Sequence, residues 1–360
     1  MSPLPSLVVN CEPRVHQKYI AVKPIIEKIL MKISVLISGI VVVSFLFPLA
    51  CSPTAVETHT VKTTVIYQIR ARFLLVNSNN FTVTDYVYVS LPQNTTFQTS
   101  RVVSMSPQPI QFLRDDDGNV YTVVQIAAEP GARVWINATY VVEVKAYSIN
   151  EEMHSGEWPP LDLVRKYTSS TGYWNIYNST LIELAYKTAF ADRPLEIARK
   201  LAEWVVQKVN YKVNFGRLGS DHAVSWWWDY SITGDCVEVA DVYVTMARIL
   251  GLPARTAYGL LLESYHDTYW LNMTTMELEG DRILEHWGGH IWPQVYVIPF
   301  GWVDVDMLDG LQPNVGVYSA RHIILGVEET KYYGSGLSSS CIPSYLTLQY
   351  VDYTFEGEEQ

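Results

Sequence analysis

The sequence predicts an α+β fold, in which a small antiparallel β-sandwich precedes a core built from both helices and strands. Residues 55–150 contain several short runs of alternating polar and apolar residues and no helical pattern. Helical patterns follow after residue 181, and residues 290–306 again have the pattern of strands. A chain in which strands and helices are largely segregated along the sequence is typical of the α+β class.

The first region has the strand pattern in its clearest form. Apolar residues occupy every second position at Val65, Tyr67, Ile69, Ala71 and Phe73. A strand with this pattern buries one face only. Turn signals at Asp117-Gly118 and Pro130-Gly131 separate further runs of the same kind. We therefore predict a β-sandwich domain over residues 55–150 and, because turn-forming residues are frequent there, a linker over residues 151–180.

The acidic run Asp115-Asp116-Asp117-Gly118-Asn119 within this region has two interpretations. Carboxylates at alternating loop positions supply the oxygen ligands that calcium prefers. The same residues also suit the solvated tip of a β-hairpin. Because no Glu follows at the spacing of a calcium-binding loop, the hairpin tip is favoured, and we expect no cofactor.

Two helices are predicted in the second half of the chain. The first has Pro194 in its first turn and Asp192 as its expected cap. The second begins near Cys236 and ends at Gly251, and it carries an apolar stripe composed of Val239, Ala240, Tyr243, Met246, Ala247 and Leu250. Cys236 therefore stands at a helix N-terminus.

Composition and charge limit the class of partner. Of the 360 residues, 48% are hydrophobic, so the chain can bury one or two cores. The net charge is −11 and the isoelectric point is about 5.2. Because nucleic acids require a clustered positive surface, the sequence indicates no nucleic-acid partner. Its oligomeric state is not predicted.

The N-terminal region indicates export. Residues 33–50 are uncharged and about as long as a minimal membrane-spanning helix. They follow Met31-Lys32, so we predict a signal peptide or membrane anchor over residues 31–51. Residues 1–30 resemble neither a targeting peptide nor a domain, and we expect translation to begin at Met31. If the segment is not cleaved, residues 33–50 would hold the protein in the membrane.

Glycosylation signals agree with an extracytoplasmic location. Five Asn-x-Ser/Thr sequons follow the apolar segment and none precedes it, at Asn80, Asn94, Asn137, Asn178 and Asn272. Sequons of this kind also arise by chance, but together with the apolar segment they favour a glycoprotein that is secreted or anchored at the cell membrane.

The four cysteines do not form an evident disulfide framework. Cys11 lies in the doubtful leader and Cys51 at the end of the apolar segment, while Cys341 could be free or could pair with Cys51. Cys236 differs because a helix N-terminus favours the thiolate. A neighbouring imidazole can form a thiolate-imidazolium pair with such a cysteine, and a carboxylate behind the ring fixes its tautomer.

Two segments carry a family resemblance. GDCVEVADVYVTMARILGLPAR, residues 234–255, resembles the nucleophile helix of the transglutaminase-like superfamily, which has a papain-like thiol-hydrolase fold. HIWPQVYVIPFGWVDVD, residues 290–306, resembles the His strand and Asp strand of that family. The resemblance implies a transglutaminase-like core over residues 181–320, with Cys236 as nucleophile, His290 as base and Asp306 as orienting carboxylate. Residues 321–360 are predicted to add strands and an acidic tail.

For several of the predicted site residues, a second residue in the sequence could fill the same role. Asp304 points to the same face of a regular strand as Asp306, and only the motif spacing favours Asp306. His286 competes with His290 but has a loop-like context. Trp228 and Tyr211 are candidates for a second donor to an oxyanion, although either residue could equally form the wall of a cleft. No paired Cys or His motif with chelating spacing is present, so no metal site is expected.

The resemblance implies a cysteine hydrolase or acyltransferase that acts on peptide or protein amides through a thioester. Water resolves the thioester in hydrolysis and an amine resolves it in transfer, and the sequence does not distinguish the two. We favour a protease or amidase over cross-linking because no lysine-binding acceptor site or calcium-activation loop is recognisable. The alternative from another class is a non-catalytic surface-binding or adhesion module that retains the fold.

Overall fold

The computed structural model describes residues 57–213, 217–226, 229–274, 286–328, 340–341 and 345–360. All these residues belong to one compact unit. The predicted leader, the apolar segment 33–50, Cys11 and Cys51 lie outside the described residues. None of the helices in the described ranges combines the length and the apolar character that a membrane span requires.

Two antiparallel sheets form the predicted sandwich. The larger sheet has the order β11-β18-β1-β6-β15, and β3 also pairs with β6. Its strands are β1 (His59–Val76), β3 (Gln98–Ser106), β6 (Arg133–Ile149), β11 (His266–Asn272), β15 (Val317–Tyr318) and β18 (Thr347–Glu359). The smaller sheet has the order β17-β2-β5-β4, with β17 (Ser340–Cys341), β2 (Val83–Ser90), β5 (Val120–Ala128) and β4 (Gln111–Arg114).

The alternation in β1 behaves as predicted. Its five alternating apolar residues, from Val65 to Phe73, are at most 3% exposed, whereas Gln68, Arg70 and Arg72 point outward to solvent. The strand therefore contributes one face to the hydrophobic core.

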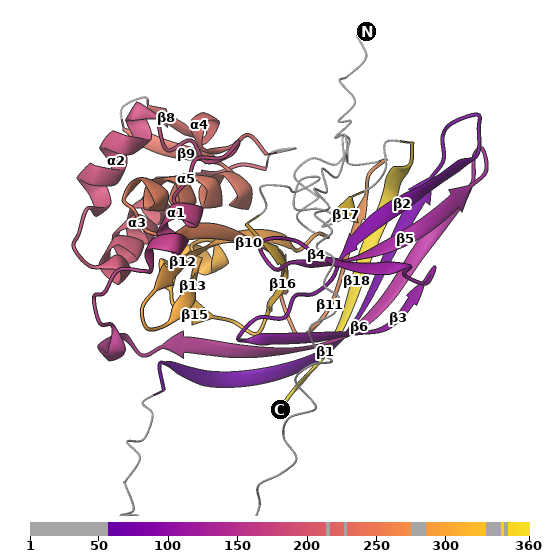
Figure 1. Cartoon of the computed structure of the whole chain (residues 1–360), viewed down its shortest axis with the longest axis horizontal. Coiled ribbons are helices and arrows are strands. Elements are labelled where there is room, and N and C mark those ends of the chain that lie inside the picture. The colour runs from indigo at the N-terminus through magenta and orange to yellow at the C-terminus, as the bar shows by residue number, and fades with distance from the viewer. Residues whose placement is uncertain (1–56, 214–216, 227–228, 275–285, 329–339, 342–344) are drawn as a thin grey trace, which may run out of the picture. The chain divides into compact units, whose positions relative to one another are not determined.

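The larger sheet joins distant parts of the chain. β18 pairs with β1 from Val76 to Val65, and β11 pairs with the other edge of β18. Figure 1 shows the yellow β18 beside the indigo β1. The sandwich is therefore built from strands before residue 150 together with strands from beyond residue 265.

A second layer consists of a five-stranded antiparallel sheet with the order β14-β13-β12-β10-β16. Its strands are β10 (Ala254–Leu261), β12 (Gly289–Val297), β13 (Gly301–Asp306), β14 (Asn314–Val315) and β16 (His322–Val327). A small sheet that packs against the helices contains β7 (Val209–Tyr211), β8 (Val224–Trp226) and β9 (Tyr230–Gly234), of which β7 runs parallel to β9.

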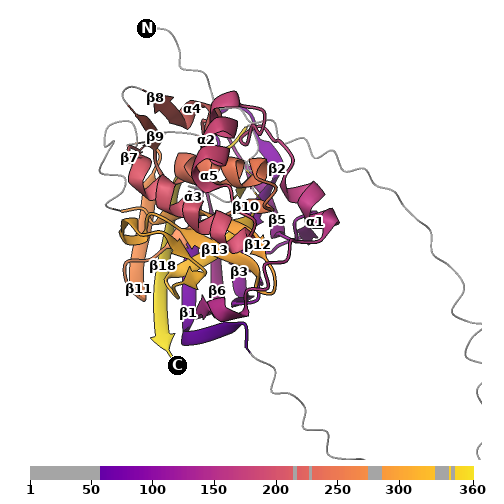
Figure 2. The same ribbon diagram turned by 90° about the vertical axis from the view of Figure 1, so that its left-hand side faces the viewer.

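The helices are α1 (Leu161–Tyr167), α2 (Ser179–Ala189), α3 (Pro194–Lys208), α4 (Ser220–Ala223) and α5 (Cys236–Ile249), with 3-10 turns η2 (Glu151–Met153) and η4 (Asp309–Leu311). Helices α3 and α5 pack on the five-stranded sheet, and α2 and α4 pack on α5 (Figure 2). Helix α5 contacts β10 and β12 on one side and α2, α3 and α4 on the other. Every residue from Val237 to Arg248 is buried, so α5 is enclosed on all faces and not only along its predicted stripe.

The predicted cap of the preceding helix was wrong. Arg193 and not Asp192 occupies the N-cap of α3, and no side chain caps that end of the helix. Pro194 is the first helical residue, where its missing N–H costs nothing because no intrahelical partner exists.

The acidic run forms a hairpin tip between β4 and β5. The Asp115 carboxylate accepts hydrogen bonds from the backbone N–H groups of Asp117 and Asn119, each at 2.9 Å. Asp117 forms an ion pair with Lys166 of α1 at 2.7 Å. These carboxylates therefore stabilise the turn and its contact with α1, as the favoured interpretation predicts.

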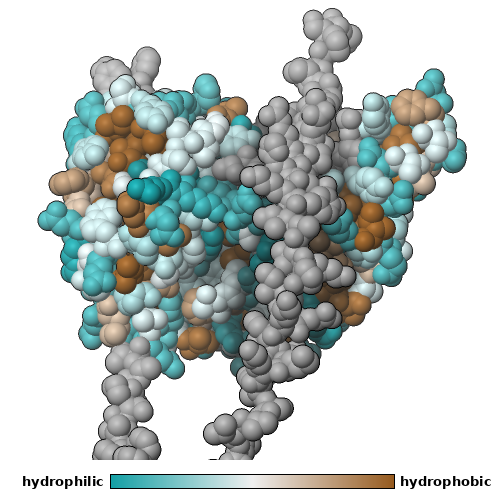
Figure 3. All heavy atoms as spheres, in the orientation of Figure 1, coloured by the Kyte–Doolittle hydropathy of each residue, from teal (hydrophilic) through white to brown (hydrophobic). Residues whose placement is uncertain are grey.

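The surface is mostly hydrophilic. On the face shown in Figure 3, hydrophobic residues gather in separate patches over the helices and over the sandwich strands. Tyr186 and Phe190, at the end of α2, are 52% and 60% exposed and stack on each other at 5.8 Å.

A buried carboxylate connects the sandwich to the five-stranded sheet. Tyr147 of β6 donates a hydrogen bond from its hydroxyl to Asp304 Oδ2 at 2.6 Å. From β12, Trp292 Nε1 and Gln294 Nε2 donate to Asp304 Oδ1 at 2.7 and 2.8 Å. Burial raises the pKa of the Tyr147 phenol, and the neighbouring Asp304 charge adds to this effect. Tyr147 is therefore a neutral donor that joins the two layers.

Tyr147→Phe should lower the free energy of unfolding by about 1.5–3 kcal/mol, the usual range for a hydrogen bond to a charged group. The substitution leaves Asp304 Oδ2 buried without this donor, while the ring keeps its packing. Urea unfolding at neutral pH measures the change. Tyr86→Phe, at a 44% exposed position, is the matched control and should change little; equal effects of the two substitutions would contradict the prediction.

Candidate active site

The start of α5 is a capping box. The Asp235 side chain accepts a hydrogen bond from the Val237 N–H at 2.9 Å, and Glu238 Oε2 accepts one from the Asp235 N–H at 3.2 Å. Gly234 makes room for this arrangement, because a Cβ at that position would lie 2.4 Å from the Glu238 Cβ. The Gly-Asp-Cys sequence thus places Cys236 at the first helical position, as predicted.

Cys236 lies against the strand that carries His290. The residue is partly exposed, and helix α5 packs against β12, in which Ile291 follows His290. Burial raises the pKa of the Cys236 thiol, the carboxylates of Asp235, Glu238 and Asp306 add to that rise, and the Ile291 N–H opposes it. A thiolate at this position therefore needs a nearby positive charge.

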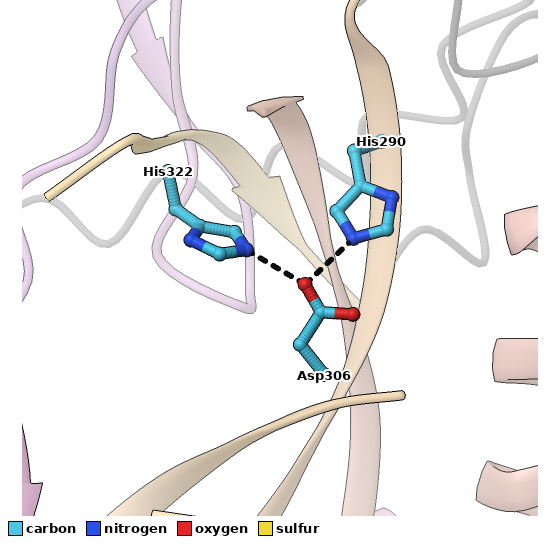
Figure 4. A group of neighbouring side chains, drawn as sticks. All are labelled: His290, Asp306 and His322. Carbon is cyan, nitrogen blue, oxygen red and sulfur yellow. Dashed lines mark hydrogen bonds and ion pairs between the residues drawn. The ribbon is translucent and has the colours of Figure 1, made fainter. Parts of the chain in front are cut away.

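His290 and Asp306 lie side by side on neighbouring strands. His290 Nε2 is 3.0 Å from Asp306 Oδ2, and both side chains are buried. A second imidazole, His322 of β16, reaches the same oxygen through its Nε2 at 2.8 Å. Figure 4 shows the two rings converging on this carboxylate from different strands.

The other oxygen of Asp306 is held by the backbone. Its Oδ1 accepts hydrogen bonds from the N–H groups of Leu308 at 2.9 Å and Asp309 at 3.3 Å. Burial alone would raise the pKa of Asp306. The charges and hydrogen bonds of His290 and His322 outweigh it, and they hold the pKa of Asp306 well below its ordinary value. The carboxylate is therefore ionised and fixed.

The two competing residues have different surroundings. Asp304 accepts hydrogen bonds from Tyr147, Trp292 and Gln294, and it forms none with His290. His286 stacks on the Trp270 ring at 4.5 Å. Of the predicted residues, the structure thus brings together His290 and Asp306, and Cys236 begins the helix that packs against the strand of His290.

Trp292 flanks both imidazoles. Its ring stacks on His290 with a centroid distance of 5.5 Å and an interplanar angle of 20°, and it meets His322 edge-on at 4.9 Å. Because Asp304 accepts a hydrogen bond from the indole, the orientation of Trp292 is fixed. The hydrogen bonds of Asp304 that join the two layers therefore also fix the Trp292 ring beside the two imidazoles.

Of the two candidates for the second oxyanion donor, Tyr211 lies within the described residues. Tyr211 of β7 pairs with Gly234 of β9, two residues before Cys236. Burial raises the pKa of the Tyr211 phenol, and the charges of Cys236, Asp235 and Glu238 raise it further. The phenol is therefore a neutral donor near the thiol. Trp228 lies outside the described residues.

His322 was not predicted from the sequence. No motif marks it, and it lies sixteen residues beyond Asp306. One indirect signal is Gly259 of β10, where a Cβ would lie 1.8 Å from the Ile323 carbonyl oxygen. This glycine allows β16 to approach β10 closely, which brings His322 to the site.

The same three residues are the candidate metal ligands. Donor atoms of His290, Asp306 and His322 lie within 4.8 Å of one another. Two imidazoles and a carboxylate would suit a divalent ion such as zinc. Each Nε2 is directed at the Asp306 oxygen, which is the geometry of a hydrogen bond.

Asp306 should stabilise the fold at neutral pH and lose this effect in acid. Because its folded-state pKa is depressed, the stabilisation is complete above the ordinary pKa and disappears as the pH falls through the folded-state value. The difference in free energy of unfolding between wild type and Asp306→Asn should therefore shrink as the pH falls below about 5, and continue to shrink until the folded-state pKa is passed. Urea unfolding measures it, with exposed Asp192→Asn as control; a difference independent of pH would refute the expectation.

Comparison with known proteins places this site in a family. The model of the transglutaminase-like superfamily matches residues 182–307. Among solved structures, a proposed cysteine protease from Cytophaga hutchinsonii superposes with a TM-score of 0.53 at 13% identity, covering 84% of this chain and 92% of that one. This likeness concerns the fold.

The periplasmic domain of TgpA from Pseudomonas aeruginosa gives TM-scores of 0.36 alone and 0.34 bound to ethylmercury, each at 12% identity. These matches cover 70% of this chain and 93% and 96% of those chains. No curated protein matches the sequence. The predicted α+β class is confirmed, and the predicted resemblance to the transglutaminase-like superfamily is confirmed over residues 182–307.

Proposed function

We propose that the chain is an exported cysteine hydrolase or acyltransferase that acts on peptide or protein amides through a thioester. The observation that carries the proposal is the contact between two elements. Helix α5, which begins at Cys236, packs against β12. His290 of that strand is hydrogen-bonded to Asp306.

The nucleophile would form by proton transfer within this group. Burial and the nearby carboxylates disfavour an isolated thiolate at Cys236, so its proton must move to an adjacent base. With Nε2–H of His290 donating to Asp306, Nδ1 is left as the basic nitrogen that accepts this proton. The anionic Asp306 then stabilises the imidazolium.

The reaction would follow the usual course of thiol catalysis. The thiolate adds to the amide carbonyl carbon, and the tetrahedral intermediate collapses as the amine leaves with the proton from His290. Water, deprotonated by His290, or a second amine then attacks the thioester and releases Cys236. The backbone N–H of Cys236 has no intrahelical partner and is one oxyanion donor. Tyr211 is our candidate for the second, and Trp228 remains a candidate on sequence grounds.

We favour hydrolysis of peptide or protein amides over cross-linking. The acidic loop at residues 115–119 uses its carboxylates within a hairpin, so the calcium-activation loop that would suggest a cross-linking enzyme is not apparent in this segment. Nothing in the described ranges marks a lysine acceptor site. A non-catalytic binding module is the alternative.

The proposed location is extracytoplasmic, either secreted or anchored by residues 33–50. Glycosylation requires the sequon asparagine to be accessible, and Asn80, Asn94 and Asn137 are exposed. Asn178 caps α2 instead, with its side chain accepting hydrogen bonds from two backbone N–H groups. The Asn94 side chain likewise accepts a hydrogen bond from the Ser100 N–H at 2.7 Å, so Asn80 and Asn137 are the better acceptors.

Cys236 should react with iodoacetamide near pH 6 faster than an ordinary thiol, because the imidazolium of His290 stabilises its thiolate. In His290→Ala the pKa of the thiol should rise, and alkylation near pH 6 should slow at least about tenfold, since each pKa unit changes the thiolate fraction tenfold. Mass spectrometry of the Cys236 peptide across pH measures the rate. His286→Ala is the matched control, and ordinary sluggish alkylation of the wild type would favour the binding module.

Activity requires a separate test. The chain, with and without added amines, should cleave or modify members of a peptide library, and Cys236→Ala should abolish product formation. Products with free carboxylates indicate hydrolysis, and amine-linked products indicate transfer. Turnover that survives Cys236→Ala would remove this site from the mechanism.

A further inference from the structure

His322 has no role in the reaction proposed above, although it reaches the same oxygen as His290. We propose that His322 is a positioning residue: it holds the Asp306 carboxylate in the place that the His290 imidazolium requires. The inference deepens the proposed function and rests on it.

The hydrogen bonds of Asp306 leave it little freedom. Oδ2 accepts from the two imidazoles at 2.8 and 3.0 Å, and Oδ1 accepts from the backbone of Leu308 and Asp309. A carboxylate offers about four acceptor positions, so all of them are filled. Without His322 one position on a buried, charged oxygen would lose its donor, and the carboxylate could turn away from His290.

The surroundings of His322 define its tautomer. Nε2 faces an acceptor, while Nδ1 is buried with no hydrogen-bond partner. A neutral ring with its proton on Nε2 satisfies the contact with Asp306 and leaves only a lone pair unmatched. With the proton on Nδ1, two lone pairs would face each other across 2.8 Å. His322 therefore serves as a donor to Asp306.

The ring is also held in place from other directions. The Tyr318 hydroxyl donates to the His322 carbonyl oxygen at 3.1 Å, and the Tyr318 ring lies 5.2 Å from the imidazole. Trp292 packs edge-on against it. Because Gly259 lets β16 approach β10, the backbone that carries His322 is fixed as well. A rigid donor of this kind can define where Asp306 lies.

The geometry favours this role over a metal site. Zinc lies about 2.0–2.2 Å from nitrogen and oxygen ligands, whose lone pairs point at the ion. Here both Nε2 atoms point at the Asp306 oxygen itself at hydrogen-bond distances. Binding an ion would require both N–H protons to leave and both rings to turn, and zinc addition is therefore included in the test.

The test compares His322→Gln with His322→Met in the full chain. The two side chains have similar length, but only the Gln amide can donate to Asp306. We expect Cys236 alkylation by iodoacetamide near pH 6 to slow about tenfold or more in His322→Met, the range for a lost hydrogen bond to a charged group, and its pH profile to move to higher pH. His322→Gln should retain most of the wild-type rate and profile.

The controls separate the possible failures. Near-ultraviolet circular dichroism checks the fold, and His322→Leu replaces the Met variant if that one does not fold. Slow alkylation of the wild type would overturn the proposed function and this inference with it. Fast alkylation in both wild type and His322→Met would overturn the positioning role alone. Zinc is added at one equivalent, and its effect on the rate of Cys236 alkylation is measured. If zinc slows alkylation of the wild type, a chelator restores the rate and His322→Met shows no such effect, the positioning role is overturned and His322 is a metal ligand instead.

Discussion

The interaction on which the rest of the structure depends is the set of hydrogen bonds to Asp304. This buried carboxylate accepts hydrogen bonds from Tyr147 of the sandwich and from Trp292 and Gln294 of the five-stranded sheet, so it joins the two layers. Further polar links join the layers at β16, where Gln98 bonds to Ile324 and Asn119 to Val327. Buried charges are tolerated when every acceptor position has a donor, and such networks favour one arrangement over others. The same bonds set the plane of the indole beside His290. Asp304 and Asp306, two residues apart on one strand, therefore hold adjacent parts of the site.

The helix that carries Cys236 is fixed by ion pairs along its length. Asp241 is buried, accepts a hydrogen bond from the Trp174 indole at 2.7 Å and pairs with Arg217. Near the other end of α5, Arg248 pairs with Glu328 at 2.8 Å and donates to the Ala254 carbonyl oxygen. Breaking one partner of a buried pair leaves an uncompensated charge, so these contacts resist displacement of the helix. The sulfur is thus presented by an element with little freedom to shift.

The sequence was most informative where a periodic or local signal exists. Alternation identified β1, and the apolar stripe with its closing glycine identified α5, because burial of one face imposes those patterns. The family resemblance paired His290 with Asp306 in preference to Asp304, and the structure has that hydrogen bond. Contacts between distant segments leave no such signal. The pairing of β18 with β1 and the arrival of His322 both depend on tertiary packing, and the cap expected at Asp192 was overridden by its neighbour Arg193.

The place of β18 in the larger sheet affects how the protein reaches its native state. Arg72 of β1 and Asp352 of β18 are bonded at 2.7 Å although they are 280 residues apart in the sequence. One edge of β1 consequently has no native partner while the intervening chain is being synthesised, and unpaired strand edges promote association with other chains. Such long-range pairing also slows folding. Completion of this sheet is therefore a late event in synthesis, because this edge of β1 stays without its native partner until residues 347–359 have been made.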